Sequence, residues 1–159
     1  MRRQRSKSGA PAVESEFKEH VVQVDRVTRT VAGGRRMRFR ATVVVGNRKG
    51  TVGVGLGKAD EVSSAVRKAV TQAKKSMLTL PLINDTIPHP IRTSYKSSNL
   101  ILLPASKGTG IIAGGTVRII ADLVGIKNLL GKSLGSTNKI NMAYAVMKAF
   151  RMLRTVPVK

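Results

Sequence analysis

The sequence contains no cysteine and no tryptophan, and aromatic residues make up only 3% of it. Without cysteine there can be no disulfide, no thiolate nucleophile and no cysteine-ligated zinc. The two histidines, His20 and His89, are too few and too far apart in sequence to suggest a metal site. The scarcity of aromatic rings argues against a surface built to stack nucleobases. We therefore expect no metal and no other cofactor.

Acidic residues are also scarce, which bears on catalysis. There are eight: Glu14, Glu16, Glu19, Asp25, Asp60, Glu61, Asp85 and Asp122. No spacing among them suggests an acid/base pair, because the adjacent Asp60 and Glu61 would point in different directions on a helix. The sequence also lacks the Gly-x-Ser-x-Gly pattern of a nucleophile elbow. We expect that the protein is not an enzyme and has no small-molecule substrate.

No apolar run approaches the roughly 18 residues that a membrane-spanning helix needs. The basic start lacks the apolar segment of a secretory signal, and Glu14 and Glu16 argue against an organellar transit peptide. We expect a cytoplasmic protein with no membrane partner. Residues 1–15 are polar and basic, and we expect them to form a disordered arm.

Positive charge is what the chain has in excess. Lysine and arginine number 29 against 8 acidic residues, a formal net charge of +21. Because 42% of residues are hydrophobic and only 23% are charged, the chain should fold rather than behave as a disordered basic tail. Self-repulsion of this size favours a polyanionic partner. The composition predicts a folded body with a strongly positive surface.

The first half predicts three strands and a helix. Apolar and polar residues alternate from about Phe17 to Arg29, from 37 to 45 and from 52 to 57, with connections at 32–36 and 46–50. Glycines at every second position of the third stretch should let another backbone approach closely. One helical stripe follows: Val62, Ala65, Val66, Ala69, Val70, Ala73 and Met77. We predict a β-β-β-α domain over residues 16–82.

The second half predicts a smaller α/β unit. Strands are expected at 91–96 and 100–103, then a glycine-rich connection over 106–115. A helix over 117–124 capped by Gly125, a short apolar piece and a helix over 141–154 complete a β-β-α-β-α pattern. The predicted fold class is α+β in two small domains, the second over 83–155, with a tail at 156–159.

Two glycine-rich segments come close to phosphate-binding motifs without fitting them. Gly125 to Ser133 places five residues between its glycines, where the P-loop needs four. Gly108 to Gly114 has three residues where a dinucleotide fingerprint needs two. We interpret both as turns, although backbone amides entering a helix near Gly114 could still hold an RNA phosphate.

The basic residues are the strongest functional signal. They crowd the loops and strands of the first half, and basic patches on a chain of this charge are typical of nucleic-acid binding. With few aromatics, contact should be made to backbone and shape, which favours structured RNA. The predicted RNA-binding residues are Arg26, Arg29, Gly33, Gly34, Arg35, Arg36, Arg38, Arg40, Arg48, Lys49, Lys58 and Lys107.

Several motifs together resemble one family. They are Val24-x-Arg26-Val27-x-x-x-Val31-x-Gly33-Gly34-Arg35, Val44-Val45-Gly46, Val52-Gly53-x-Gly55-x-Gly57-Lys58-Ala59, Pro104-Ala105-x-x-Gly108 to Gly115, and Gly135-Ser136-Thr137-Asn138-x-Ile140-Asn141. In this order, over about Phe17 to Leu153, the chain resembles the bacterial-type S-five family of small-subunit ribosomal proteins.

The resemblance implies a first domain like the double-stranded-RNA-binding fold without its first helix, and a second with a left-handed βαβ crossover. It implies that the loop at 28–36 contacts small-subunit rRNA. It places Gly110 and Arg118 at an interface with ribosomal protein S-four that influences translational accuracy. It also implies a position beside the messenger RNA entry path and contact with protein S-eight. Asp60 and Glu61 depart from the lysine-rich helix start of the duplex-binding fold.

Two other hypotheses stay open at this point. The chain could be an extraribosomal protein that binds or remodels structured RNA on the same two-domain plan. It could also be an enzyme, because the second-domain fold occurs in kinases and ATPase-type proteins. Sedimentation with ribosomal subunits would distinguish a ribosomal protein from an extraribosomal one. Nucleotide binding would support the enzyme hypothesis.

Overall fold

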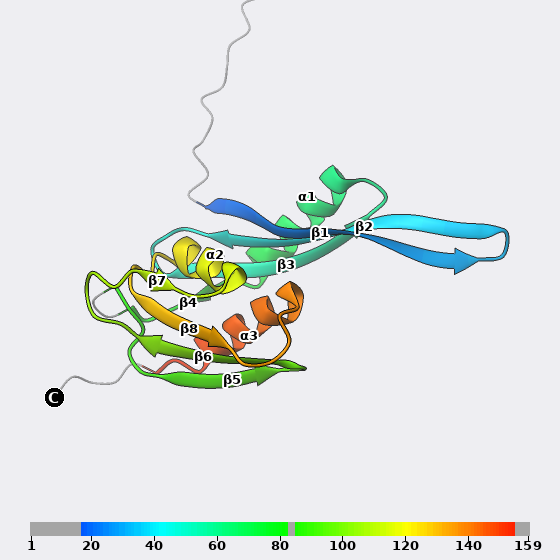
Figure 1. Ribbon diagram of the computed structural model, residues 1–159. Helices are drawn as coiled ribbons and strands as arrows, with labels where there is room; N and C mark the ends of the chain where they lie inside the picture. Colours follow the sequence, from blue (N-terminus) through cyan, green and yellow to red (C-terminus); the bar gives the residue numbers. More distant parts are fainter. Residues whose placement is uncertain (1–16, 83–84, 155–159) are drawn as a thin grey trace, which may run out of the picture.

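A computed structural model describes residues 17–82 and 85–154, so the predicted arm and tail lie outside the described residues. The first unit contains β1 (Lys18–Val31), β2 (Gly34–Gly46), β3 (Thr51–Ala59), α1 (Val62–Lys75) and β4 (Leu78–Thr79). Its strands form one antiparallel sheet in the order β1-β2-β3-β4 (Figure 1). The β-β-β-α prediction is confirmed, and the two-residue β4 was not predicted.

The second unit contains β5 (Ile91–Tyr95), β6 (Ser98–Pro104), β7 (Ile111–Ile112), α2 (Gly115–Val124), β8 (Leu129–Ser133) and α3 (Lys139–Arg151). Its sheet has the order β5-β6-β8-β7, and only the β7–β8 pair is parallel. The segment predicted as a plain connection thus contains β7, and β7-α2-β8 is a βαβ crossover. The left-handed sense of that crossover and the domain boundaries stay predictions.

Helix α1 lies directly on strand β3. A Cβ added at Gly55 would collide with the Ala69 carbonyl oxygen and lie 2.6 Å from the Ala73 backbone nitrogen. The close approach predicted from the alternating glycines is confirmed. The structure also corrects which residues of the predicted apolar stripe are buried. The small alanines face the sheet, while Val66 and Val70 are only partly buried and Val62 is exposed.

The first sheet is covered on both faces. Val43 and Val45 pack with Ala65, Ala69 and Ala73 of α1. Val44, Val52 and Val54 point the other way and join the core of the second unit. The two units therefore share the larger of two hydrophobic cores, and the first sheet lies between α1 and the second unit (Figure 1).

The β2–β3 connection fastens the two units. The backbone amides of Arg48 and Gly50 donate to the carbonyls of Leu123 and Val124 at the end of α2, at 2.9 and 2.8 Å. Gly125 takes the left-handed φ of 96° that the predicted cap requires, and a Cβ there would collide with the Arg48 carbonyl. This contact holds the β2–β3 connection against the second unit.

A two-stranded ribbon extends beyond the body of the first sheet (Figure 1). β2 pairs with β3 only from Phe39 onward, so residues 27–31 and 34–38 pair only with each other. All residues from 28 to 38 are exposed. This corrects the predicted loop at 32–36, because Arg35 and Arg36 lie in β2 and the turn is confined to Ala32 and Gly33.

None of the helices in the described ranges is long and apolar enough to cross a membrane.

Candidate RNA-binding surface

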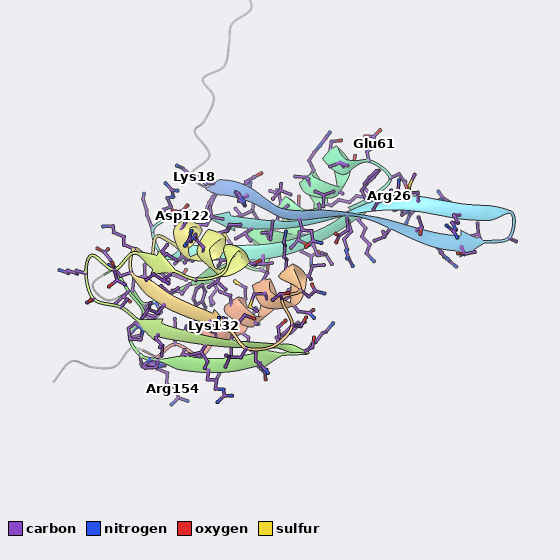
Figure 2. The ribbon with its side chains drawn as sticks, viewed as in Figure 1. Lys18, Arg26, Glu61, Asp122, Lys132 and Arg154 are labelled. Atoms are coloured by element: carbon purple, nitrogen blue, oxygen red, sulfur yellow. The ribbon has the colours of Figure 1, made fainter. Side chains whose placement is uncertain are left out.

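The ribbon carries arginines on both of its faces. Cross-strand partners share a face, and the register pairs Arg29 with Arg36 and Val27 with Arg38. The opposite face carries Arg35, opposite Thr30, and Arg26, opposite Phe39. Because Phe39 packs with the α1 cluster, the face of Arg26 and Arg35 is continuous with the α1 side of the sheet. Figure 2 shows Arg26 near the base of the ribbon.

The tip of the ribbon depends on two glycines. Gly33 and Gly34 have φ of 92° and 148°, values that side-chain-bearing residues rarely adopt. A Cβ at either position would have no atom within 4 Å. The two glycines are therefore needed for backbone conformation, and the space around the tip is open to a partner.

Two ribbon-base arginines are held by acids of the first unit. Arg38 Nε donates to Asp60 Oδ1 at 2.9 Å. Arg40 Nε and Nη2 both donate to Asp25 Oδ2, at 3.2 and 2.7 Å, and the Gln23 amide donates to Asp25 Oδ1. The hydrogen bond from Arg40, and then that from Gln23, hold the pKa of the Asp25 carboxyl below its usual 3.8. Arg40 thus stiffens the ribbon base, which gives it a structural role beside the predicted RNA contact.

The other four ribbon arginines are available to bind an anionic partner. Within residues 17–82 and 85–154, no carboxylate forms an ion pair with Arg26, Arg29, Arg35 or Arg36. All four are exposed. A guanidinium has five donors in a planar fork, which suits phosphate oxygens. The ribbon is therefore a narrow, cationic, extended element with open surroundings.

The remaining predicted cations of the first unit lie elsewhere. Arg48 has φ of 56°, and its Nη2 donates to Asp122 Oδ2 on α2 at 2.6 Å. The structure thus gives Arg48 a role as a bridge between the units. The backbone of Lys49 donates to the Asn47 side chain at 2.8 Å within the same turn. Lys58 is exposed near the end of β3, beside α1.

Lys107, Gly110 and Arg118 form a second location, away from the ribbon. The loop that contains Lys107 and Gly110 lies at the opposite end of the molecule from the ribbon tip (Figure 1). Arg118 Nη2 donates to the Ile111 carbonyl at 3.2 Å, so Arg118 lies against the segment that follows Gly110. The structure therefore brings Gly110 and Arg118 together and separates them, with Lys107, from the ribbon.

Asn128 organises this loop, and the sequence analysis missed it. Its buried Oδ1 accepts hydrogen bonds from the backbone amides of Gly108 and Gly110, both at 3.1 Å. These two amides are therefore occupied, whereas the possible phosphate contact of the amides that enter α2 near Gly114 stays a prediction. A single asparagine next to a strand carries no sequence signal for this role, because its glycine partners lie about 20 positions earlier.

The residues that the sequence analysis considered for metal and nucleotide binding can be located in the described residues. No group of three histidine or acidic side chains in them is close enough to hold a metal ion. The near P-loop is dispersed, because Gly125 caps α2 while Gly131 and Ser133 lie within β8. The interpretation of that segment as structural agrees with this placement.

Comparison with known proteins places the chain in a family. Residues 17–81 match the family model "Ribosomal protein S5, N-terminal domain", and residues 93–157 match "Ribosomal protein S5, C-terminal domain". A relative from Campylobacter jejuni is 52% identical over 139 residues, covering 87% of this chain and 95% of its own length. One from Thermus thermophilus is 51% identical over 142 residues, covering 89% and 88%. One from Thermotoga petrophila is 48% identical over 138 residues, covering 87% and 78%.

All three relatives carry the name small ribosomal subunit protein uS5. The matches cover both units of the fold, so the similarity is not limited to one domain. The resemblance found from the sequence motifs is confirmed, and the chain belongs to the ribosomal protein S5 family.

Proposed function

We propose that this protein is a structural, non-catalytic component of the small ribosomal subunit in the cytoplasm, and that its β1–β2 ribbon binds rRNA. The observation that carries the proposal is the ribbon itself, with four exposed arginines unpaired among the described residues. The named relatives are small-subunit proteins, which supports the same partner for this chain.

The shape of the ribbon supports insertion into folded RNA. A two-stranded hairpin without a covering layer is only marginally stable in water. We therefore expect a bound partner to stabilise the ribbon. Here that partner must be anionic, because Arg29 and Arg36 lie side by side and repel one another in the free protein. A phosphate bound on the face that carries both arginines would remove this repulsion.

The test is the salt dependence of RNA binding by the full-length protein. Each phosphate that a cation neutralises contributes about 0.9 to the slope of log affinity against log salt on a duplex. Replacing Arg35 and Arg36 with Ala should lower the slope by about 2 and leave thermal unfolding unchanged, because neither residue has a core contact. A slope that the double variant leaves unchanged would remove the ribbon from the binding surface.

A matched control distinguishes the effect of losing the ribbon site from the effect of losing net charge. Arg92 and Arg151 are exposed cations on β5 and α3. Replacing both with Ala removes the same charge from the second unit, and we expect a smaller change in slope. Cosedimentation of the wild-type protein with small subunits distinguishes a ribosomal component from an extraribosomal RNA-binding protein.

We also propose that the surface at Gly110 and Arg118 contacts ribosomal protein S-four, and that other surfaces contact protein S-eight and border the messenger RNA path. The family resemblance carries these proposals. The contact of Arg118 with the Ile111 carbonyl supports the first of them, because it puts the exposed Arg118 next to the segment that follows the half-buried Gly110.

A further inference from the structure

A groove runs between β3 and α1, on the side of the first sheet away from the second unit. Its volume is about 470 Å³, and its lining residues are Leu56, Gly57, Lys58, Arg67, Lys68, Thr71, Gln72 and Lys75. Four of these are cations and none is acidic. We propose that this groove is a second RNA site, separate from the ribbon, that holds the phosphate backbone of one RNA strand. The proposal rests on the RNA-binding function proposed above.

The four cations are available. Lys58, Arg67, Lys68 and Lys75 are exposed, and among the described residues none has an ion pair or a side-chain hydrogen bond. The nearby acids are engaged elsewhere: Asp60 accepts from Arg38, and Glu19 pairs with Lys74, which does not line the groove. Glu61 Oε2 accepts from the Ser63 hydroxyl at the start of α1. Neither Asp60 nor Glu61, the acids that set this helix apart from a lysine-rich start, lines the groove.

The helical wall has the spacing of a continuous track. Arg67, Thr71 and Lys75 lie four residues apart, so they form one row along α1. Eight residues of helix span about 12 Å, enough for more than one phosphate of a strand. Lys68 and Gln72 form a parallel row. The Thr71 hydroxyl donates to the Arg67 carbonyl at 3.0 Å, so the available donors of the first row are the cations Arg67 and Lys75. Cations spaced along a groove suit a regularly spaced polyanion.

The strand wall adds backbone donors. β4 pairs with β3 only at Thr51 and Val52, so the rest of that β3 edge is open. The Val54 carbonyl points to this edge, where it accepts from the Ser76 hydroxyl at 3.0 Å. The direction of backbone hydrogen bonding alternates along a strand, so Leu56 and Lys58 direct their backbone amides to the same edge as Val54. Backbone amides are common phosphate ligands, so both walls of the groove are suited to the same partner.

The close packing of α1 gives the groove its shape. A Cβ at Gly57 would collide with the Ala65 carbonyl and lie 3.1 Å from the Lys68 Cβ. Because Gly57 has no side chain, the stem of Lys68 rests directly over the strand. The cations on α1 and Lys58 on β3 are thereby held on facing walls. The start of α1, labelled at Glu61, lies near the base of the ribbon beside Arg26 (Figure 2).

The test compares three full-length proteins on a mixed-sequence RNA duplex and a single strand of equal length. The variant R67Q/K68Q/K75Q removes three groove cations and keeps polar, helix-compatible side chains. The control R92Q/K132Q/R151Q removes three exposed cations from the second unit. We expect the groove variant to lower the salt slope by about 2 to 3 on duplex and somewhat less on the single strand. The control should change it by less than 1.

The outcomes separate this inference from the proposed function. Equal slopes for the groove and control variants would overturn the groove, because the loss would then reflect net charge alone. If the wild-type protein binds RNA and only the ribbon variant R35A/R36A changes the slope, the proposed groove site is wrong and the proposed ribbon site is supported. If the wild-type slope is near zero, RNA binding itself fails. Additive losses from ribbon and groove variants would support two separate sites.

Discussion

At the scale of single residues, Asp25 shows how an acid in a basic protein is kept ionised. Its carboxylate accepts from Arg40 and Gln23, and these bonds keep its pKa below 3.8. The folded state therefore favours the charged form. The resulting stabilisation is complete above pH 3.8 and is lost as the pH falls through the lower pKa of the folded protein.

We predict that Asp25→Asn lowers the free energy of unfolding by about 1 kcal/mol at pH 7, because both partners are less than one-third exposed. The difference from wild type should shrink toward zero as the pH falls below 3.8. Urea unfolding from pH 7 to pH 2.5 measures it. Asp85→Asn is the control, because the Lys127 side chain that pairs with Asp85 is 72% exposed and should contribute little. A difference that stays constant with pH would show that the charge of Asp25 is not involved.

At the scale of elements, the packing of α1 on β3 depends on a missing side chain. A Cβ at Gly55 would meet backbone atoms of α1, which cannot move unless the whole helix moves. We predict that Gly55→Ala destabilises the protein by about 3 kcal/mol or more. Gly33→Ala should cost about 1 kcal/mol, since only its positive φ opposes a side chain. Denaturant unfolding of both variants tests this, and equal losses would contradict the tight contact.

The same contact explains what the sequence could and could not predict of the helix. The period of the stripe placed α1 correctly, because its apolar positions repeat at helical spacing. It gave valine and alanine equal weight, however. Glycines on β3 bring the helix axis so close that only alanine fits between, and Val66 and Val70 are displaced to the flank. The size of a side chain facing another element depends on that element, which periodicity does not include.

The ribbon and the groove were hidden for related reasons. Residues 30–36 are exposed and lack the alternation that identifies a strand, so Arg35 and Arg36 were predicted as loop. Arg67, Lys68 and Lys75 lie off the predicted apolar stripe of the helix, so periodicity indicates only that they face solvent. The i, i+4 and i+8 spacing of Arg67, Thr71 and Lys75 was visible in the sequence, but the facing wall of the groove comes from β3. Arg48 and Asp122 are 74 positions apart, so their pairing had no local signal.

At the scale of the whole molecule, the surplus of positive charge is divided among separate surfaces. The described aspartates each pair with a cation: Asp25 with Arg40, Asp60 with Arg38, Asp85 with Lys127 and Asp122 with Arg48. Among the described residues, the other ribbon arginines and the groove cations have no ion pair. The Gly110–Arg118 surface differs, because Arg118 is directed to a backbone carbonyl of its own unit. This division is consistent with the proposed RNA contact of the ribbon and the proposed protein contact at Gly110 and Arg118.

The surface at Gly110 and Arg118 leads to a prediction about translation. Gly110 has φ of 76°, and a Cβ there would have no atom within 4 Å, so Gly110→Arg strains one turn and projects a bulky cation outward without disturbing the core. Arg118→Leu removes the donor to the Ile111 carbonyl and a charge available to a partner. If the contact with protein S-four holds one of two subunit conformations, a change of about 1.4 kcal/mol shifts their balance tenfold.

We expect both variants to assemble into subunits and to misread near-cognate codons several-fold more often in a reporter assay. Arg92→Leu, which removes an exposed cation from β5 of the same unit, should leave misreading unchanged. Parental misreading in subunits shown to contain the Gly110 and Arg118 variants would exclude the two residues from control of accuracy.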